Sequence, residues 1–122
     1  CYNNQLTALD VSGCTNLTTL NCYNNRLTSL DVSSCTALKK LYCNNNQLTA
    51  LDVSGCTNLT SLNCYDNRLT ILDVSMNKVL SYLKCNMSSL LVLYVSKNAE
   101  IKGITDYWST EYINSITEIS YI

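Results

Sequence analysis

Leucine and cysteine recur along the chain at a fixed interval of 21 residues. We call a set of positions at this interval a file. One leucine file holds Leu6, Leu27, Leu48, Leu69 and Leu90. All eight cysteines fall in two files, namely Cys1, Cys22, Cys43, Cys64 and Cys85, and Cys14, Cys35 and Cys56. Repetition at a fixed period of this length indicates an array of stacked structural units.

Each unit contains two similar halves, and each half carries an apolar, polar, apolar triplet. In the first unit these triplets are Leu9-Asp10-Val11 and Leu20-Asn21-Cys22. Such alternation predicts a short strand with one face buried. Runs of Ser, Gly, Asn and Thr separate the triplets and predict turns, and no stretch carries a sustained helical period. Each unit is therefore expected to be a coil of two short strands and two tight corners.

A single coil of this kind cannot bury its own leucines, but stacked coils can, with neighbouring strands about 4.8 Å apart. The expected fold is a β-rich solenoid of about five to six coils with a leucine-lined core. Ser88 and Tyr94 stand where the files predict asparagine and aspartate, and the register is lost beyond Ile104. We therefore expect a solenoid over residues 1–104 and a capping segment over residues 105–122.

The two ends of the chain differ. Tyr107, Trp108 and Tyr112 give the capping segment aromatic bulk that could cover the last open core, and residues 115–122 alternate like a short closing strand. Cys1 falls within a strand triplet, at the position that Cys22 has in the next unit. The array is therefore expected to start in mid-repeat, as part of a longer protein.

The segment from Leu17 to Ala37, LTTLNCYNNRLTSLDVSSCTA, resembles bacterial leucine-rich repeats of the nested 21-residue subclass called IRREKO. The resemblance implies a right-handed solenoid with a parallel sheet through Leu20, Leu41, Leu62 and Leu83. It also implies a second ladder of short strands at Leu9, Leu30, Leu51, Leu72 and Leu93. Asparagine side chains are expected to bond backbone groups inside the turn at Asn25, Asn46 and Asn67. The resemblance also implies a bacterial protein that is secreted or held at the cell surface.

Three interpretations of the cysteines are open: disulfides, a metal site, or core residues. In-register residues on parallel strands lie about 4.8 Å apart, which would strain a disulfide. Zinc requires four converging ligands, whereas a file presents parallel side chains and the chain has no histidine. Asn77 also replaces a cysteine in the second file. The pattern favours cysteine as a small buried residue, and we expect no metal or other cofactor.

The aspartate file comprises Asp10, Asp31, Asp52 and Asp73, each between two inward-facing residues. Carboxylates stacked in this way repel unless each accepts hydrogen bonds nearby. Calcium binding is one interpretation, because carboxylate oxygens suit that ion. One carboxylate per coil supplies few ligands, so capping of turn amides or bonding to adjacent hydroxyl groups is favoured.

The outward positions of the main sheet are the candidate recognition surface, because repeat scaffolds commonly bind through such positions. They are rich in tyrosine and amide side chains, a mixture suited to protein contacts. The alternative is that tyrosine is used there only for its strand propensity. The candidate binding residues are Tyr23, Lys40, Tyr42, Asn63, Tyr65, Tyr82 and Lys84.

Composition narrows the function. The net charge of −1 and the absence of basic runs argue against a nucleic-acid partner. The array offers no Ser/His or Cys/His arrangement and no phosphate loop, which argues against an enzyme. No apolar stretch approaches the length of a membrane span.

We therefore expect a non-catalytic binding or adhesion module whose partner is a protein, such as one on a host or cell surface. A glycan-binding surface is the first alternative, since tyrosine stacking and amide hydrogen bonds would also serve sugars. A repeat spacer without a ligand is the second. A remote variant of the spacer alternative is ice binding through a file of threonines, namely Thr7, Thr28, Thr49 and Thr70.

Overall fold

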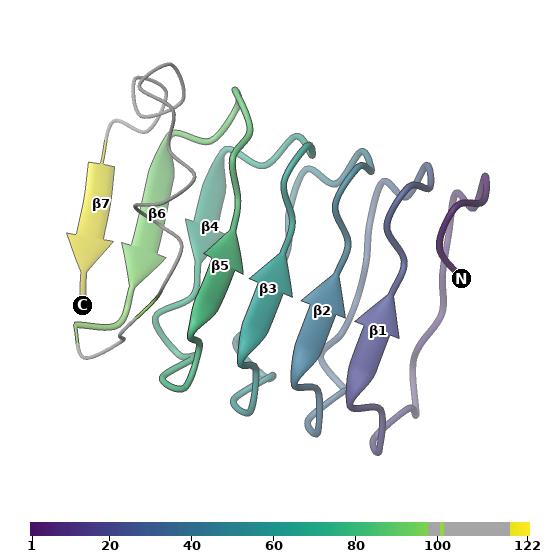
Figure 1. Ribbon diagram of the computed structural model, residues 1–122, viewed down its shortest axis with the longest axis horizontal. Helices are drawn as coiled ribbons and strands as arrows, with labels where there is room; N and C mark the ends of the chain where they lie inside the picture. Colours follow the sequence, from purple (N-terminus) through teal and green to yellow (C-terminus); the bar gives the residue numbers. More distant parts are fainter. Residues whose placement is uncertain (98–100, 102–117) are drawn as a thin grey trace.

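The computed structural model describes residues 1–97, 101 and 118–122. Four parallel strands form the main sheet in the order β1-β2-β3-β5 (Figure 1). They are β1 (Thr19–Asn21), β2 (Lys40–Tyr42), β3 (Ser61–Asn63) and β5 (Tyr82–Lys84). Their central leucines pair in register, as the sequence predicts for Leu20, Leu41, Leu62 and Leu83. The part of the chain that the structure describes makes about four turns of a parallel β-solenoid, so the predicted fold class is confirmed.

The core is a continuous column of side chains from successive coils. The leucines at positions 27, 48, 69 and 90 are fully buried, and so are Leu41 and Leu62 from the main sheet. Leu6 and Leu9 of the first coil are only partly buried. Burial of each leucine therefore depends on a neighbouring coil, which is the energetic basis of a stacked repeat.

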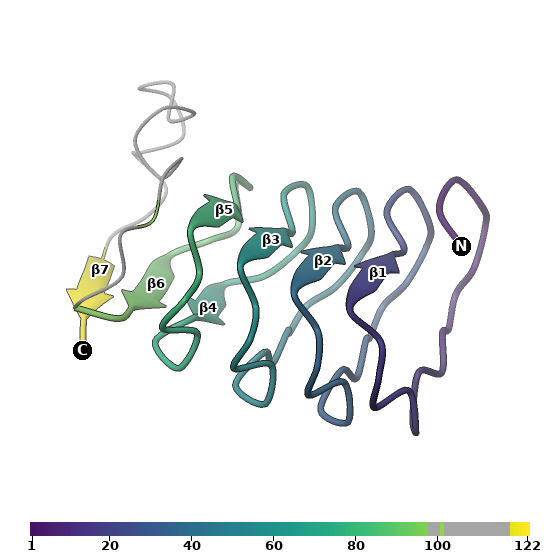
Figure 2. The same cartoon turned by 60° about the horizontal axis from the view of Figure 1, so that its bottom comes forward.

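A second parallel sheet lies on the opposite side of the coils (Figure 2). Its strands are β4 (Ile71–Asp73), β6 (Val92–Val95) and β7 (Glu118–Tyr121), paired in that order. The predicted second ladder is confirmed at Leu72 and Leu93, which pair with each other. The prediction is wrong at Leu9, Leu30 and Leu51, where no strand forms.

The difference between these coils follows from the residue that precedes each of these leucines. Ala8, Ser29 and Ala50 occupy this position in the coils without a second strand. Ile71 and Val92 occupy it where strands form. β-branched residues favour extended, paired backbone, whereas alanine does not. A change from small to β-branched residues along one file thus begins the second sheet at the fourth coil.

The asparagine file joins successive coils, as the resemblance implied. Asn46 donates from Nδ2 to the carbonyls of Cys22 and Cys43, at 3.0 Å each, and accepts from the Leu27 amide at 3.0 Å. Asn25 and Asn67 repeat the same arrangement. Each buried amide therefore satisfies three backbone groups that would otherwise lack partners.

Most cysteines are buried in the core, and those of the second file also donate hydrogen bonds to backbone carbonyls. All eight cysteines are free thiols, and six of them are buried. In the second file, Cys35 and Cys56 donate to the Val11 and Val32 carbonyls at 3.8 and 3.6 Å. Asn77 takes the same role toward the Val53 carbonyl at 2.9 Å. That position therefore requires a buried donor, which explains why asparagine can replace cysteine there.

Cys1 and Cys14 depart from the core interpretation, because both are exposed. Both lie in the first coil, and among the described residues no other coil packs against its outer side, so their side chains lack the neighbours that bury the later members of each file.

The aspartate file caps turns. Oδ1 of each member accepts a hydrogen bond from the amide of the serine two residues later, at 2.8 to 2.9 Å. Hydrogen bonds from the serine side chain, and then from its amide, lower the pKa of Asp10, Asp31 and Asp52. This agrees with the structural interpretation. Within the described ranges, no group of three or more His, Cys, Asp or Glu side chains is arranged to hold a metal ion.

At the C-terminal end, β7 pairs in parallel with β6, within the segment predicted to form a closing strand. Tyr107, Trp108 and Tyr112 lie outside the described residues, and the capping role of residues 105–122 stays a prediction. In the portion of the chain that was searched, no helix is long and apolar enough to cross a membrane.

Candidate binding face

The outward side of the main sheet, which we call the sheet face, consists of three short files. In-register pairing places each strand residue of the first two files beside its equivalent in the next coil, and the third file lies just beyond the ends of the strands. The files are Thr19, Lys40, Ser61 and Tyr82; Asn21, Tyr42, Asn63 and Lys84; and Tyr23, Asn44, Tyr65 and Asn86. All seven candidate residues lie on this face. Lys40 and Tyr82 are exposed, and the other five are half-buried.

Aromatic contacts order the sheet face at both ends. The rings of Tyr2 and Tyr23 stack with centroids 4.9 Å apart and an interplanar angle of 10°. The Lys84 Nζ lies 4.2 Å from the centroid of the Tyr65 ring, which is a cation–π distance. Sequence reasoning missed Tyr2, although its position 21 residues before Tyr23 was a usable signal. These contacts hold the tyrosines in place before any partner arrives.

Two depressions interrupt the sheet face. A small one of about 180 Å³ lies among Tyr23, Tyr42, Asn44 and Asn63. A larger one of about 500 Å³ is lined by Tyr65, Asp66, Asn67, Lys84, Asn86, Met87 and Ser88. Small-molecule sites are commonly enclosed and mainly apolar, whereas these depressions are open and lined largely by amide and hydroxyl groups. The surface suits the projecting side chains of a macromolecule.

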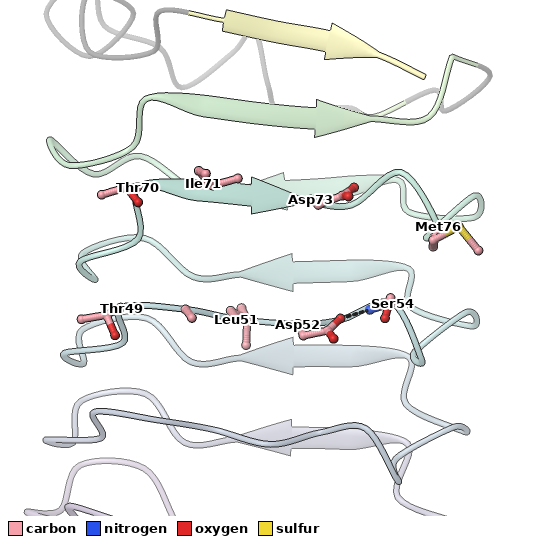
Figure 3. A pocket seen from close by; sticks show the side chains of 9 residues that line it. Thr49, Leu51, Asp52, Ser54, Thr70, Ile71, Asp73 and Met76 are labelled. Atoms are coloured by element: carbon pink, nitrogen blue, oxygen red, sulfur yellow. Dashed lines mark hydrogen bonds between the residues drawn. The ribbon is translucent and has the colours of Figure 1, made fainter.

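A groove of larger volume, which the sequence did not reveal, lies on the opposite side of the coils (Figure 3). It has a volume of about 590 Å³ and runs between residues 49–54 and residues 70–76. The first of these segments is not a strand, so the two backbones do not close against each other. Leu51, Ile71 and Met76 line the groove together with Asp52 and Asp73. The hydrogen bond from the Ser54 amide holds Asp52 at its edge, at 2.9 Å.

The buried thiols are poorly suited to nucleophilic chemistry. Burial raises the pKa of Cys22 to about 11 and that of Cys85 to about 12. Burial also raises the pKa of Cys43 and Cys64, which lie between them in the file. Reactive cysteines need the opposite shift, so these thiols stay protonated and inert at neutral pH.

Comparison with solved structures identifies two similar proteins from Listeria monocytogenes. The functional domain of InlJ, described as including a cysteine ladder, is 41% identical over 85% of this chain, with a TM-score of 0.71. The internalin InlF is 24% identical over 99% of this chain, with a TM-score of 0.64, and shares the fold. The chain spans 26% of the InlJ structure and 40% of the InlF structure. Comparison with curated protein sequences finds no significant match.

The repeat family itself is matched over much of the solenoid. Residues 1–35 and 36–74 each match the family described as Leucine Rich repeats (2 copies). Proteins of this internalin-like kind are generally non-catalytic and act as binding repeat modules. Together with the parallel coils and the 21-residue spacing, these matches show that the chain belongs to the leucine-rich repeat family.

Proposed function

We propose that the sheet face is a protein-binding surface of an adhesion module that is secreted or displayed on a bacterial cell surface. The observation that carries the proposal is the gathering of tyrosines on one side of the main sheet. Tyr42 and Tyr82 lie within its in-register strands, and Tyr23 and Tyr65 lie just beyond the ends of β1 and β3. Tyrosine provides a large contact area with few rotatable bonds and a polar tip, so little conformational entropy is lost on binding.

Amide side chains lie beside the tyrosines but are less accessible. Asn21 and Asn63 lie in the same file as Tyr42, and Asn44 and Asn86 lie in the file of Tyr65. Asn44 is buried, and the Oδ1 atoms of Asn21, Asn63 and Asn86 are covered, so the tyrosines supply most of the surface that a partner can contact. The internalin-like relatives support a protein ligand, since binding modules of this repeat class commonly engage proteins through the sheet.

The test is capture of partners from extracellular protein and glycan mixtures on the immobilised chain. A variant with Tyr23→Ser, Tyr42→Ser and Tyr65→Ser removes the tyrosine surface. A control with Thr28→Ala, Thr49→Ala and Thr70→Ala changes three exposed side chains outside the sheet face. We expect the wild type and the control to retain the same protein and the tyrosine variant to lose it, while circular dichroism shows that all three fold.

Three other outcomes would favour an alternative function or exclude the sheet face. Release of the captured material by soluble sugars would favour the glycan alternative. If the wild type captures nothing, the chain is better described as a spacer. If the tyrosine variant retains the partner as well as the wild type does, the sheet face is not the recognition surface.

A further inference from the structure

The groove on the side opposite the sheet face follows a break in the backbone hydrogen bonding between coils. No backbone hydrogen bond among the described residues joins residues 49–54 to residues 70–76. On its other side, β4 is bonded to the next coil, as in the hydrogen bond from the Val74 amide to the Tyr94 carbonyl at 2.9 Å. β4 is the first strand of its sheet, so the groove runs along an open sheet edge (Figure 3).

Two exposed apolar side chains line this groove. Ile71 on β4 is 55% exposed, and Met76 in the following turn is 53% exposed. Leu51 lines the groove as well, although it is largely buried. Covering apolar surface of this kind is favourable, and exposed apolar side chains beside a groove are a feature of surfaces that bind another molecule.

The charge along the groove is negative. Asp52 and Asp73 line it, and a neighbouring depression of about 320 Å³ adds Asp31. Neither hollow is lined by a lysine or arginine, and none of these three carboxylates forms an ion pair among the described residues. Lys78, which follows Met76 by two residues, lies outside both linings. A segment that enters the groove therefore meets two carboxylates and no lining cation.

The two aspartates of the groove retain acceptor capacity after they cap their turns. Oδ1 of Asp52 accepts a hydrogen bond from the Ser54 amide, and Oδ1 of Asp73 accepts one from the Ser75 amide, at 2.9 Å each. The Ser54 hydroxyl also bonds Asp52. A carboxylate has about four acceptor positions on its two oxygens, and both side chains are exposed. Further donors can therefore reach them.

We infer that the groove binds a basic segment of a partner protein. An arginine or lysine of this segment bonds Asp52 and Asp73, and an apolar side chain next to it packs on Ile71 and Met76. A metal ion would leave the apolar side chains uncovered, and an acidic segment would meet like charge. The groove and the sheet face lie on opposite sides of the coils, so this partner is distinct from the one proposed above.

The experiment selects phage-displayed random peptides of about 12 residues, which span about 40 Å when extended, on the immobilised chain. Peptides that an Ile71→Thr, Met76→Ser variant does not retain define binding to the groove. Threonine keeps the β-branched side chain that favours β4. We expect these peptides to carry arginine or lysine next to apolar residues.

The charge contribution is then measured on the same peptides. Their affinity should fall about three- to tenfold for an Asp52→Asn, Asp73→Asn variant, and it should also fall when the salt concentration is raised. Asparagine keeps an oxygen that accepts from the serine amide, so the turn caps survive in this variant.

A variant with Asp10→Asn and Asp66→Asn is the matched control, because it removes the same charge at exposed positions outside the groove. This control and the tyrosine variant of the sheet face should bind the peptides as the wild type does, while circular dichroism shows that every variant folds. Groove-dependent peptides without basic enrichment, equal weakening in both aspartate variants, or recovery of no groove-dependent peptide would overturn the inference. None of these results bears on the sheet face.

A second copy of the chain is the competing occupant of the groove. We expect sedimentation velocity of the wild type alone to show a monomer. Concentration-dependent association that the Ile71→Thr, Met76→Ser variant abolishes would assign the groove to self-association and overturn the inference.

Discussion

Asn45 donates a hydrogen bond from Nδ2 to Oδ1 of Asn24, its equivalent in the preceding coil, at 2.5 Å. Asn24 in turn donates to Asn3 at 2.7 Å, which makes a ladder of side-chain amides along one corner of the solenoid. All three residues have positive φ near 54°, a conformation that asparagine tolerates better than most residues. The ladder thus joins coils at the turn position where the backbone adopts its least favourable conformation.

The amide ladder is interrupted at Asp66, which occupies the same position in the next coil with φ of 52°. A carboxylate cannot donate, and the buried Oδ1 of Asn45 has no hydrogen-bond partner among the described residues. Asp66→Asn supplies the missing donor and should raise the free energy of unfolding by about 1 kcal/mol in urea titrations. Asp52→Asn, the same change outside the ladder, should give no such gain. Equal effects of the two substitutions would refute this account of the ladder.

Removal of one member of the buried asparagine file should be strongly destabilising. Asn67 bonds the Cys43 and Cys64 carbonyls and the Leu48 amide, each at 3.0 Å. Asn67→Ala leaves these groups without partners and should lower the free energy of unfolding by about 3 kcal/mol or more. Asn58→Ala removes one exposed hydrogen bond to the Thr36 carbonyl and should cost less than about 1 kcal/mol. If Asn67→Ala lowers the free energy of unfolding no more than Asn58→Ala does, the buried hydrogen bonds of Asn67 do not stabilise the stacked coils.

The aspartate caps predict sensitivity to acid. Hydrogen bonds lower the pKa of Asp31 and Asp52 below the ordinary value of 3.8, so protons bind these groups more weakly in the folded chain than in the unfolded one. Their stabilisation is present above about pH 4 and is lost as the pH falls through the lowered folded values. The Asp31→Asn, Asp52→Asn variant keeps the acceptor oxygens but does not titrate.

We therefore expect the wild type to lose more stability than this double variant between pH 6 and about pH 3, as measured by urea titration at each pH. Identical losses in the two proteins would show that these carboxylates do not contribute to the acid response.

Thiol accessibility follows from the stacking of the coils. Cys1 and Cys14 are exposed, and the other six cysteines are buried free thiols. Iodoacetamide should modify two thiols in the folded chain and the remaining six after denaturation, with no reductant added, as counted by mass spectrometry. Thiols that become reactive only after reduction would contradict the free-thiol state of the files.

The main sheet was predictable because every coil repeats the same triplet, and stacking requires those triplets to lie in register. The second sheet was overpredicted because its triplets look alike, while the residue before them changes from Ala50 to Ile71. That change affects strand propensity without altering the apolar pattern. At the sheet face, the file positions could be predicted from spacing. The Tyr2–Tyr23 stack and the groove beside Asp52 depend on side-chain placement and coil separation, which spacing alone does not fix.

The most direct test of recognition by the sheet face is hydroxyl-radical footprinting of the chain with and without its captured protein partner. Tyr42, Tyr65 and Tyr82 should lose reactivity in the complex, because the partner would cover the sheet face. Met76, which is 53% exposed in the groove on the opposite side, should react equally in both states and serves as the internal reference. Protection of Met76 with unchanged tyrosine reactivity would contradict the account and place the partner on the other side of the solenoid.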